Sequence, residues 1–118
     1  MELKNLGKSS FLEIMGDNPR NRILDFLISE NGFDYTLKEI AKESRVGYAT
    51  IKRTWHHFVK NNVVRETRRV GKAAFYKYND KSELGKKIKK FYIGILVDAV
   101  EPKKGSLGKR QEEIKAVV

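Results

Sequence analysis

Residues 36–78 read TLKEIAKESRVGYATIKRTWHHFVKNNVVRETRRVGKAAFYKY, and their apolar spacing predicts two short helices joined by a tight turn. Thr36 and Glu39 form a capping box, because each side chain can satisfy a backbone N–H group at the start of the first helix. Gly47 can start the second helix, whose apolar residues follow i, i+4, i+7, i+8 spacing. The residues expected to face the core are Leu37, Ile40, Ala41, Val46, Ile51, Trp55, Phe58 and Val59.

Two basic β-strands are predicted to follow the second helix. Residues 63–67 and 73–78 are rich in β-branched and aromatic side chains, and they flank the run Arg-Arg-Val-Gly-Lys at 68–72. We expect a hairpin whose tip is this basic run. Two helices, a tight turn and a basic hairpin, in this order, indicate a winged helix-turn-helix.

Two further helices are predicted before this motif. The segment FLEIM is expected to form a short helix that begins after Ser9 or Ser10 and stops near Gly16. Pro19, preceded by an Asp and an Asn that can cap, suits the first position of the next helix, which Asn-Gly at 31–32 ends. Both helices carry an apolar face that needs a partner in the core.

A long helix and a tail are predicted at the C-terminal end. Asp80 with Glu83 marks a capped start, one apolar face continues over about four to five turns, and Pro102 closes the helix. We expect one domain at residues 1–100 and a flexible tail at 101–118, which mixes Gly, Ser and both charges. The expected fold class is mainly α with a small β-hairpin, a winged helix-turn-helix with flanking N- and C-terminal helices.

Positive charge is concentrated on the central motif. The chain carries a formal net charge of +10, and residues 36–79 hold eleven Lys and Arg against three Glu, which is +8. This charge indicates an anionic partner, with nucleic acid as the first candidate. The absence of cysteine excludes disulfides and thiolate metal sites, and the longest apolar run, at 91–97, is too short to span a bilayer. We expect no cofactor, no membrane partner and a cytoplasmic, nucleoid-associated protein.

Two segments resemble those of known regulators. MGDNPRNRIL at 15–24 is similar to the LGDPTRLRIL type of segment that opens the DNA-binding domain of arsenical-resistance-repressor-like and MarR-like winged helix-turn-helix regulators. IAKESRVGYATI at 40–51 resembles their pattern of hydrophobic-Ala, Gly-Val and a Ser/Thr-rich helix start. The chain departs from the pattern at Arg45 and Asn62, where glycine is usual, and at Thr54, where an apolar residue is usual.

This resemblance implies a transcription regulator that binds double-stranded DNA in a sequence-specific way. It further implies a homodimer on a palindromic site, with recognition helices in successive major grooves and wings along the flanking backbone or minor groove. The metal-sensing members of these groups rely mainly on cysteines, so the resemblance does not extend to that activity here.

The exposed face of the second motif helix and the hairpin tip carry the candidate DNA contacts. Arg53 is the best candidate for base reading, because a bidentate bond from guanidinium to guanine gives about 1–3 kcal/mol of discrimination. The other Lys and Arg residues fit phosphate, whose binding is sequence-independent and salt-sensitive, and Tyr48 and Thr50 fit either role. The full set expected at DNA is Tyr48, Ala49, Thr50, Lys52, Arg53, His57, Lys60, Arg68, Arg69 and Lys72.

The C-terminal helix carries more apolar surface than one small domain covers. We therefore expect a second copy of the chain to pack on it. The residues expected at this dimer surface are Phe11, Leu12, Ile88, Phe91, Tyr92, Ile95 and Leu96.

Two other functions remain open at this stage. A sequence-independent chromatin protein is favoured by charge alone, and a winged-helix protein-protein interaction module would bind through the apolar C-terminal face. An enzyme is not expected, because the chain has no phosphate-binding glycine loop, no Cys nucleophile and no metal-ligand cluster. His56 and His57 point about 100° apart on a helix, a poor geometry for binding one metal ion.

Overall fold

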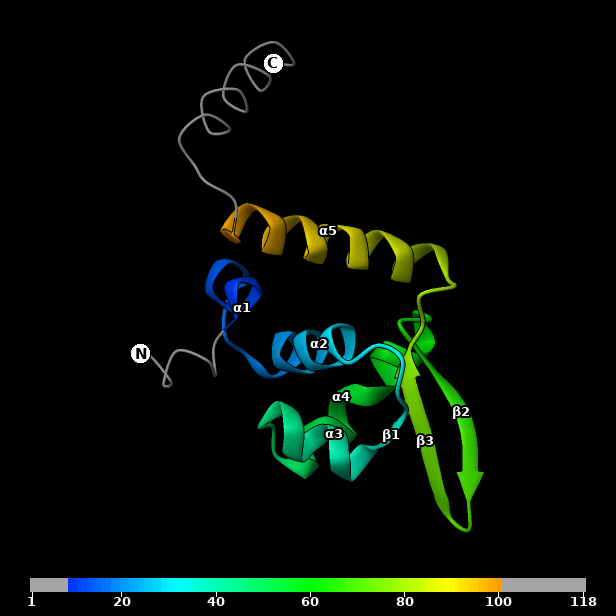
Figure 1. Cartoon of the computed structure of the whole chain (residues 1–118). Coiled ribbons are helices and arrows are strands. Elements are labelled where there is room, and N and C mark those ends of the chain that lie inside the picture. The colour runs from blue at the N-terminus through cyan, green and yellow to red at the C-terminus, as the bar shows by residue number, and fades with distance from the viewer. Residues whose placement is uncertain (1–8, 101–118) are drawn as a thin grey trace, which may run out of the picture.

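The computed structural model describes residues 9–100 of the 118-residue chain, and the predicted order of helices and strands is present (Figure 1). The fold is mainly helical with a small antiparallel sheet that forms the wing, as predicted. The tail predicted at 101–118 lies outside the described residues. The elements are α1 (Ser10–Met15), α2 (Pro19–Ser29), β1 (Tyr35–Thr36), α3 (Leu37–Ser44), α4 (Tyr48–Lys60), β2 (Val64–Val70), β3 (Ala73–Tyr78) and α5 (Glu83–Val100).

One core joins the helix-turn-helix, the wing and the long C-terminal helix. In Figure 1, α5 lies across α1 and α2 on one side, α3 and α4 lie on the other side of α2, and the β2–β3 hairpin projects beside them. Phe11 of α1 packs on Tyr92 of α5 with ring centroids 5.1 Å apart. Trp55 of α4 meets Tyr76 of β3 edge-on at 5.2 Å. The most deeply buried large side chains are Tyr78, Ile23, Ile40 and Ile51.

Side-chain caps begin three of the helices at positions that local sequence signals indicated. The capped start predicted at Asp80 is wrong, because α5 begins at Glu83 and Ser82 Oγ caps it by accepting the Gly85 N–H. Ser9 Oγ accepts a backbone N–H of α1 at 3.2 Å, and Asn18 Oδ1 accepts one of α2 at 3.0 Å. The predicted capping box is present: Glu39 N–H donates to Thr36 Oγ1 at 3.2 Å, and Thr36 N–H donates to Glu39 Oε1 at 2.9 Å. Each such cap contributes about 1 kcal/mol, so these boundaries are specified locally.

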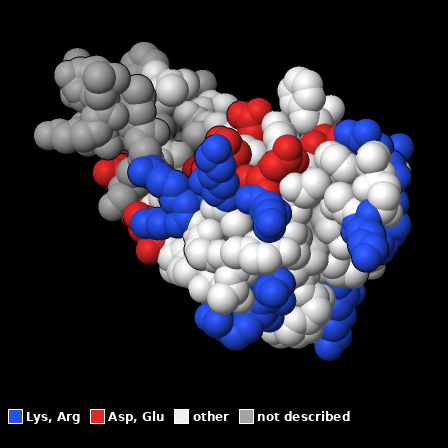
Figure 2. Space-filling view, turned by 90° about the horizontal axis from the view of Figure 1, so that it is seen from below, with Lys and Arg blue, Asp and Glu red and all other residues white. Residues whose placement is uncertain are grey.

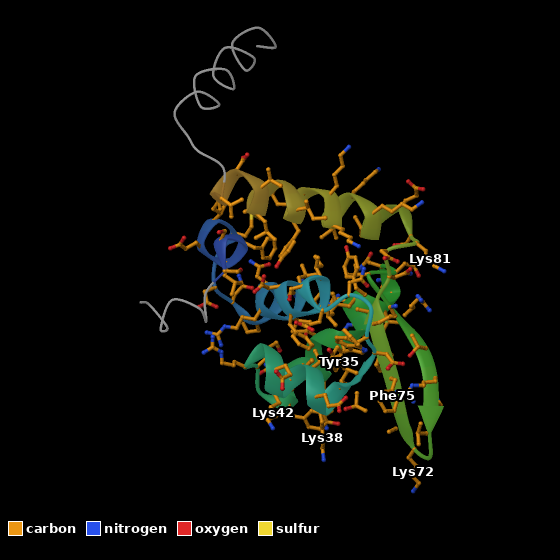
Figure 3. The ribbon with its side chains drawn as sticks, in the orientation of Figure 1. Tyr35, Lys38, Lys42, Lys72, Phe75 and Lys81 are labelled. Atoms are coloured by element: carbon orange, nitrogen blue, oxygen red, sulfur yellow. The ribbon has the colours of Figure 1, made fainter. Side chains whose placement is uncertain are left out.

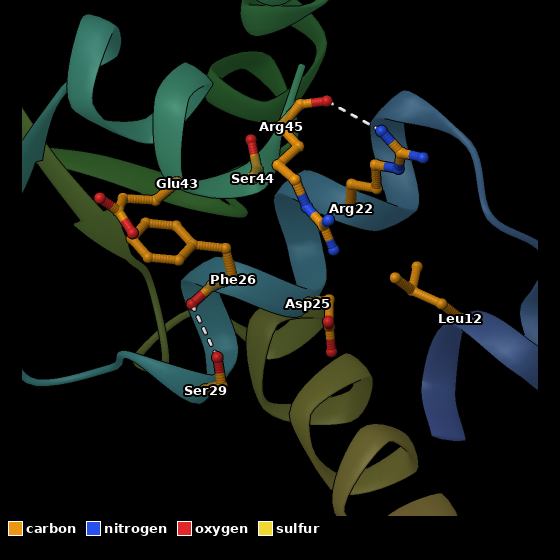
Figure 4. A pocket seen from close by; sticks show the side chains of 8 residues that line it. All are labelled: Leu12, Arg22, Asp25, Phe26, Ser29, Glu43, Ser44 and Arg45. Atoms are coloured by element: carbon orange, nitrogen blue, oxygen red, sulfur yellow. Dashed lines mark hydrogen bonds between the residues drawn. The ribbon is translucent and has the colours of Figure 1, made fainter. Parts of the chain in front are cut away.

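The turn between α3 and α4 uses an arginine in the left-handed conformation. Arg45 has φ 59° and ψ 45°, a conformation that costs a residue other than glycine about 1–2 kcal/mol. Arg22 Nη1 of α2 donates a hydrogen bond to the Arg45 carbonyl oxygen at 2.8 Å (Figure 4). Arg22 also forms an ion pair with Asp17 at 2.6 Å. These contacts from α2 hold the turn in its strained conformation.

The wing is longer than the sequence predicted. Its three antiparallel strands have the order β1-β3-β2, and the sequence analysis did not predict β1 as a strand. β2 continues to Val70, through the two arginines expected at the tip, so only Gly71 and Lys72 turn the chain. Gly71 has φ 61°, a left-handed conformation that suits a two-residue hairpin turn. Arg68 and Arg69 are therefore strand residues rather than tip residues.

The prediction that Val59 of α4 lies in the core is wrong. Val59 is 45% exposed, although helical spacing grouped it with Trp55 and Phe58. It lies about 80° around the helix from Ile51, at the edge of the buried stripe, and Thr54 on the opposite edge is half-buried instead. Trp55 is 6% exposed and lies in the core, as predicted.

α5 packs on its own chain with most of the residues that were expected to face a second copy. Tyr92 is 3% exposed and its hydroxyl donates to Asp25 of α2 at 2.7 Å. Phe91, the next residue around the helix, is 52% exposed and stays on the surface. The predicted dimer residues that lie in or against the chain's own core are Phe11, Leu12, Ile88, Tyr92, Ile95 and Leu96.

A tight junction joins the wing to α5. The Tyr78 hydroxyl donates to the Gly85 carbonyl oxygen at 2.6 Å. Ser82 Oγ donates to the Asn62 carbonyl oxygen at 2.8 Å and accepts the Gly85 N–H at 2.9 Å. A Cβ atom on Gly85 would lie 1.9 Å from the Asn79 carbonyl oxygen, so only glycine fits here. The direction of α5 relative to the wing is therefore fixed.

Candidate nucleic-acid interface

One face of the molecule brings the helix-turn-helix and the wing tip together. Lys38 and Lys42 of α3 and Lys72 of the wing extend to the same side of the molecule in Figure 3. Figure 2 shows the molecule from below, with blue atoms over its right side, where the wing lies, and over its lower part. Red atoms lie above the centre and at the left of this view, next to a further group of blue atoms left of the centre. This face is therefore positively charged over the motif that the sequence singled out.

α4 leaves one side open to solvent. The Arg53 guanidinium makes one hydrogen bond within residues 9–100, from Nη2 to Thr50 Oγ1, and at 3.5 Å it is weak. Arg53 is therefore free to bind another acceptor. Of the predicted α4 contacts, Thr50 is half-buried, and the exposed ones are Tyr48, Ala49, Lys52, Arg53, His57 and Lys60.

The first residue of α4 lies between lysines. The Tyr48 ring centroid is 4.9 Å from Lys52 Nζ and 5.9 Å from Lys38 Nζ. A hollow of about 320 Å³ next to this ring is also lined by Lys72 and Tyr76, so it connects the helix-turn-helix with the wing. Ammonium groups and a phenol around one hollow provide the donors that a phosphate group accepts.

Sequence reasoning missed Lys38 and Lys42. Both are exposed on α3, and both point to the same side as the wing tip (Figure 3). They are four positions apart in the sequence, so they lie one above the other on α3, beside the buried stripe that contains Ile40. This spacing was the signal that could have identified them.

The rings of the two histidines of α4 lie close together, with their planes tilted by 36°. The ring centroids of His56 and His57 lie 4.0 Å apart. The pKa of His57 is below its usual value, because the neighbouring His56 first, then partial burial, Arg20 and Lys60 disfavour its protonated form. His57 therefore presents a neutral ring at pH 7. Arg20 of α2 adds a positive charge beside it that the sequence analysis did not include.

Arg68 is bound to the segment before β1. Its Nε and Nη2 donate to the Asp34 carboxylate at 2.9 and 3.1 Å, and its guanidinium lies 4.1 Å from the Phe75 ring centroid. The Thr67 hydroxyl donates to the same carboxylate at 2.6 Å. The bond from Arg68 first, and then that from Thr67, lower the pKa of Asp34 to about 2. Arg68 thus anchors the wing within the chain.

Arg69 and Lys72 are the more accessible charges of the wing. Arg69 Nε donates to Glu66 Oε2 at 2.8 Å, but the Arg69 side chain remains 60% exposed. Lys72 is exposed at the turn. Because the Arg69 pair is open to solvent, it is weak and exchangeable for another anion.

The charged and hydrogen-bonding groups of this face suit an anionic partner. Within residues 9–100, no three His, Cys, Asp or Glu side chains come together in a way that could hold a metal ion. None of the helices in the same part of the chain combines the length and the apolar character needed to cross a membrane. The face offers cations, hydroxyl groups and imidazole rings.

Comparison with known proteins bears on the fold. No protein-family model matches the chain, and no curated protein matches it. The crystal structure of overoxidized AbfR bound to DNA is similar to it, with a TM-score of 0.50 and 12% sequence identity over 98% of this chain and 85% of that one. At this identity the similarity shows a shared fold and assigns no role to individual residues.

Proposed function

We propose that this chain is a DNA-binding transcription regulator that reads duplex sequence with α4 and holds the flanking backbone with α3 and the wing. The observation that carries the proposal is the grouping of exposed Lys and Arg from α3, α4 and the hairpin on one face (Figures 2 and 3). The similar AbfR structure contains bound DNA, which supports the same partner here. Such a protein acts on the nucleoid in the cytoplasm, and we propose no enzymatic activity.

The proposed contacts divide into base reading and backbone binding. Arg53 reads guanine in the major groove, because its guanidinium is exposed and free to bond bidentately. Ala49 fits an apolar contact with a thymine methyl group, and Tyr48, Thr50 and His57 offer hydrogen bonds to base edges or phosphate. The residues proposed to bind phosphate are Lys38, Lys42, Lys52, Lys60, Arg69 and Lys72.

Arg68 has a different proposed role from the other wing cations. Its bidentate bond to Asp34 and its position over Phe75 occupy both the edge and the face of the guanidinium. We therefore assign Arg68 to holding the wing in place, with only a secondary contribution to phosphate binding.

We further propose a homodimer on a palindromic site. The apolar side chains that α5 and α1 leave on the surface support a second copy, because a monomer seldom exposes many large apolar side chains without a partner. Most of the residues first expected at the dimer surface are buried in the chain's own core. Of the residues predicted there, Phe91 is the one that we still assign to the dimer surface. The exposed apolar residues available to a partner copy are Ile14, Met15, Leu84, Phe91, Ile93 and Val97.

The proposal is tested by selecting random duplex DNA with the purified full-length chain. Binding is carried out at about 150 mM salt, where loose phosphate binding is weakened, and the retained DNA is sequenced. The expected result is an inverted repeat with half-sites about 10 base pairs apart, one helical turn, as a two-fold dimer requires.

Other outcomes of the selection would contradict the proposal in distinguishable ways. Retention of duplexes without an enriched motif would contradict sequence reading and favour a sequence-independent chromatin protein. Failure to retain DNA would contradict DNA binding altogether and favour a protein-protein interaction module that binds through α5.

A further inference from the structure

We propose that the outward face of the wing sheet is a docking groove for an extended acidic segment of another protein. This wing groove has a volume of about 680 Å³ and lies between the segment before β1 and strands β2 and β3. Its volume lies within the usual range of about 300–1,000 Å³ for binding pockets. Six of the residues that line it are Phe33, Arg65, Thr67, Arg68, Phe75 and Lys77.

The wing groove is a different surface from the candidate DNA-binding face. Tyr76 of β3 faces inward and packs on Trp55 of α4. Side chains alternate along a strand, so Phe75 and Lys77 face the opposite way, out of the sheet. In Figure 3, Phe75 lies on the wing, to one side of Lys38 and the other α3 lysine. A partner in the groove therefore does not have to compete with DNA on α4.

Two unpaired cations lie side by side in the wing groove. Arg65 of β2 is directly opposite Lys77 of β3 in the strand register, an arrangement of like charges that destabilises a sheet. Neither side chain forms a hydrogen bond or an ion pair with another residue between 9 and 100. Arg65 Nε is moreover buried without an acceptor in this part of the chain. An external carboxylate that meets the terminal nitrogens of the two side chains in the groove would neutralise their repulsion.

The acidic residues of the groove are already bound to other groups. Asp34 accepts the bidentate bond from Arg68 and the hydroxyl of Thr67. Glu39 accepts the backbone N–H of Thr36 in the capping box. Asp80 attracts Lys77 through space, but it also pairs with Lys89 and accepts a hydrogen bond from Asn31. A further carboxylate beside Arg65 and Lys77 is therefore favoured, and charge complementarity points to an acidic partner.

The apolar part of the groove favours a polypeptide over a phosphate backbone. Phe33 is 66% exposed, and Phe75 is partly covered by the Arg68 guanidinium. A phosphate backbone offers no apolar group that could pack on Phe33. An extended acidic segment with an aromatic side chain satisfies both halves of the groove, the cations with its carboxylates and Phe33 with its ring.

The test measures binding of a fluorescein-labelled peptide of alternating Asp and Phe to the full-length chain by fluorescence anisotropy, up to about 1 mM protein. We expect the peptide to bind, and its counterpart with Asn in place of Asp to bind at least about tenfold more weakly. The double variant Arg65→Gln/Lys77→Gln should lose about tenfold or more in affinity, as should Phe33→Ser. The matched control Lys86→Gln/Lys90→Gln removes the same charge from α5 and should bind the peptide like the wild type.

Four results would overturn the proposal. Equal affinity for the Asp and Asn peptides would exclude recognition of the carboxylates. An equal loss of peptide affinity in the α5 control variant would show that only the net charge of the protein matters. A larger loss of duplex DNA affinity in Arg65→Gln/Lys77→Gln than in the α5 control would assign the groove to the DNA interface. If the double variant does not fold, the melting temperature of the wild type is measured with and without the Asp peptide. The peptide should raise this temperature, and an unchanged melting temperature would contradict the proposal. The outcome does not depend on whether the chain binds DNA.

Discussion

Arg53 is the residue with the most specific proposed role. Its guanidinium is exposed on α4 and weakly held by Thr50, so it can turn toward a base without breaking an ion pair. We expect Arg53→Ala to lower affinity for the selected site by about 1–3 kcal/mol and to leave affinity for scrambled duplexes nearly unchanged. Anisotropy titrations on both duplexes measure this, with Lys52→Ala as the phosphate-binding control. Equal losses on the two duplexes would show that Arg53 does not read sequence.

Arg69 tests the proposed backbone contact of the wing. Its exposed pair with Glu66 is easily exchanged for a phosphate, so Arg69→Ala should weaken binding to every duplex to a similar extent. The slope of log affinity against log salt should fall by about one unit, because one fewer phosphate charge is neutralised. Lys87→Ala, on α5, is the matched control and should keep the wild-type slope. An unchanged slope for Arg69→Ala would remove Arg69 from the interface.

Asp34 makes the wing anchor sensitive to acid. Its pKa of about 2 in the folded chain lies below the ordinary value of 3.8, so the bond to Arg68 stabilises the fold above about pH 4 and is lost as the pH falls toward 2. Asp34→Asn should therefore melt at a lower temperature than the wild type at pH 7, and this difference should disappear by about pH 2. Circular dichroism melts across the pH range measure the difference. A difference that persists at pH 2 would mean that Asp34 acts through something other than its charge.

At the scale of elements, the start of α5 depends on one glycine. A Cβ on Gly85 would lie 1.9 Å from a backbone oxygen at the end of β3, whereas a Cβ on Gly94 in the same helix would meet nothing within 4 Å. Gly85→Ala should therefore lower the free energy of unfolding by about 3 kcal/mol, as severe overpacking does. Gly94→Ala should raise it by about 0.5–1 kcal/mol, because alanine favours a helix interior. Urea denaturation of the pair measures both values, and similar effects at the two sites would contradict the tight junction.

The elements that sequence predicted are those specified by local signals. The Thr36 cap and most of the apolar stripe of α4 involve residues three to eight positions apart, which spacing reveals. For the first two helices the sequence left two neighbouring cap residues open, and the structure selects Ser9 and Asn18. The full length of β2 was missed, because its end is supported by Arg68, which bonds to Asp34 across 34 positions. No local pattern contains such a contact.

The candidate site was predicted in the same uneven way. The exposed side of α4 follows directly from the helical period, and it is open in the structure as expected. The sequence also showed that α5 carries a broad apolar face. Residue spacing does not show which part of that face α1 and α2 of the same chain cover. Tyr92 is buried and Phe91 is exposed, a distinction that only the packed structure makes.

At the scale of the whole molecule, Phe91 tests the proposed dimer. It is 52% exposed on α5, so replacing it leaves the chain's own core intact. We expect the wild type to have twice the chain mass in solution and Phe91→Asp to be a monomer, because a charge at an apolar interface is costly. Light scattering after size-exclusion chromatography gives the mass, and Lys87→Ala is the control. A wild-type monomer at the concentrations used for DNA binding would contradict the dimer.

The junction between the wing and α5 also has a mechanical consequence. The hydrogen bonds of Tyr78, Ser82 and Gly85 hold the wing and α5 tightly together. We therefore expect the wing and α5 to move as one rigid body. In the proposed dimer, the span between the two α4 helices is then a property of the protein and does not adapt to the DNA. One base pair added between half-sites lengthens the DNA by about 3.4 Å and also rotates one half-site about the axis. The DNA of such a site has to be untwisted before both α4 helices can enter their major grooves. A rigid dimer would therefore favour DNA sites with one particular spacing between half-sites.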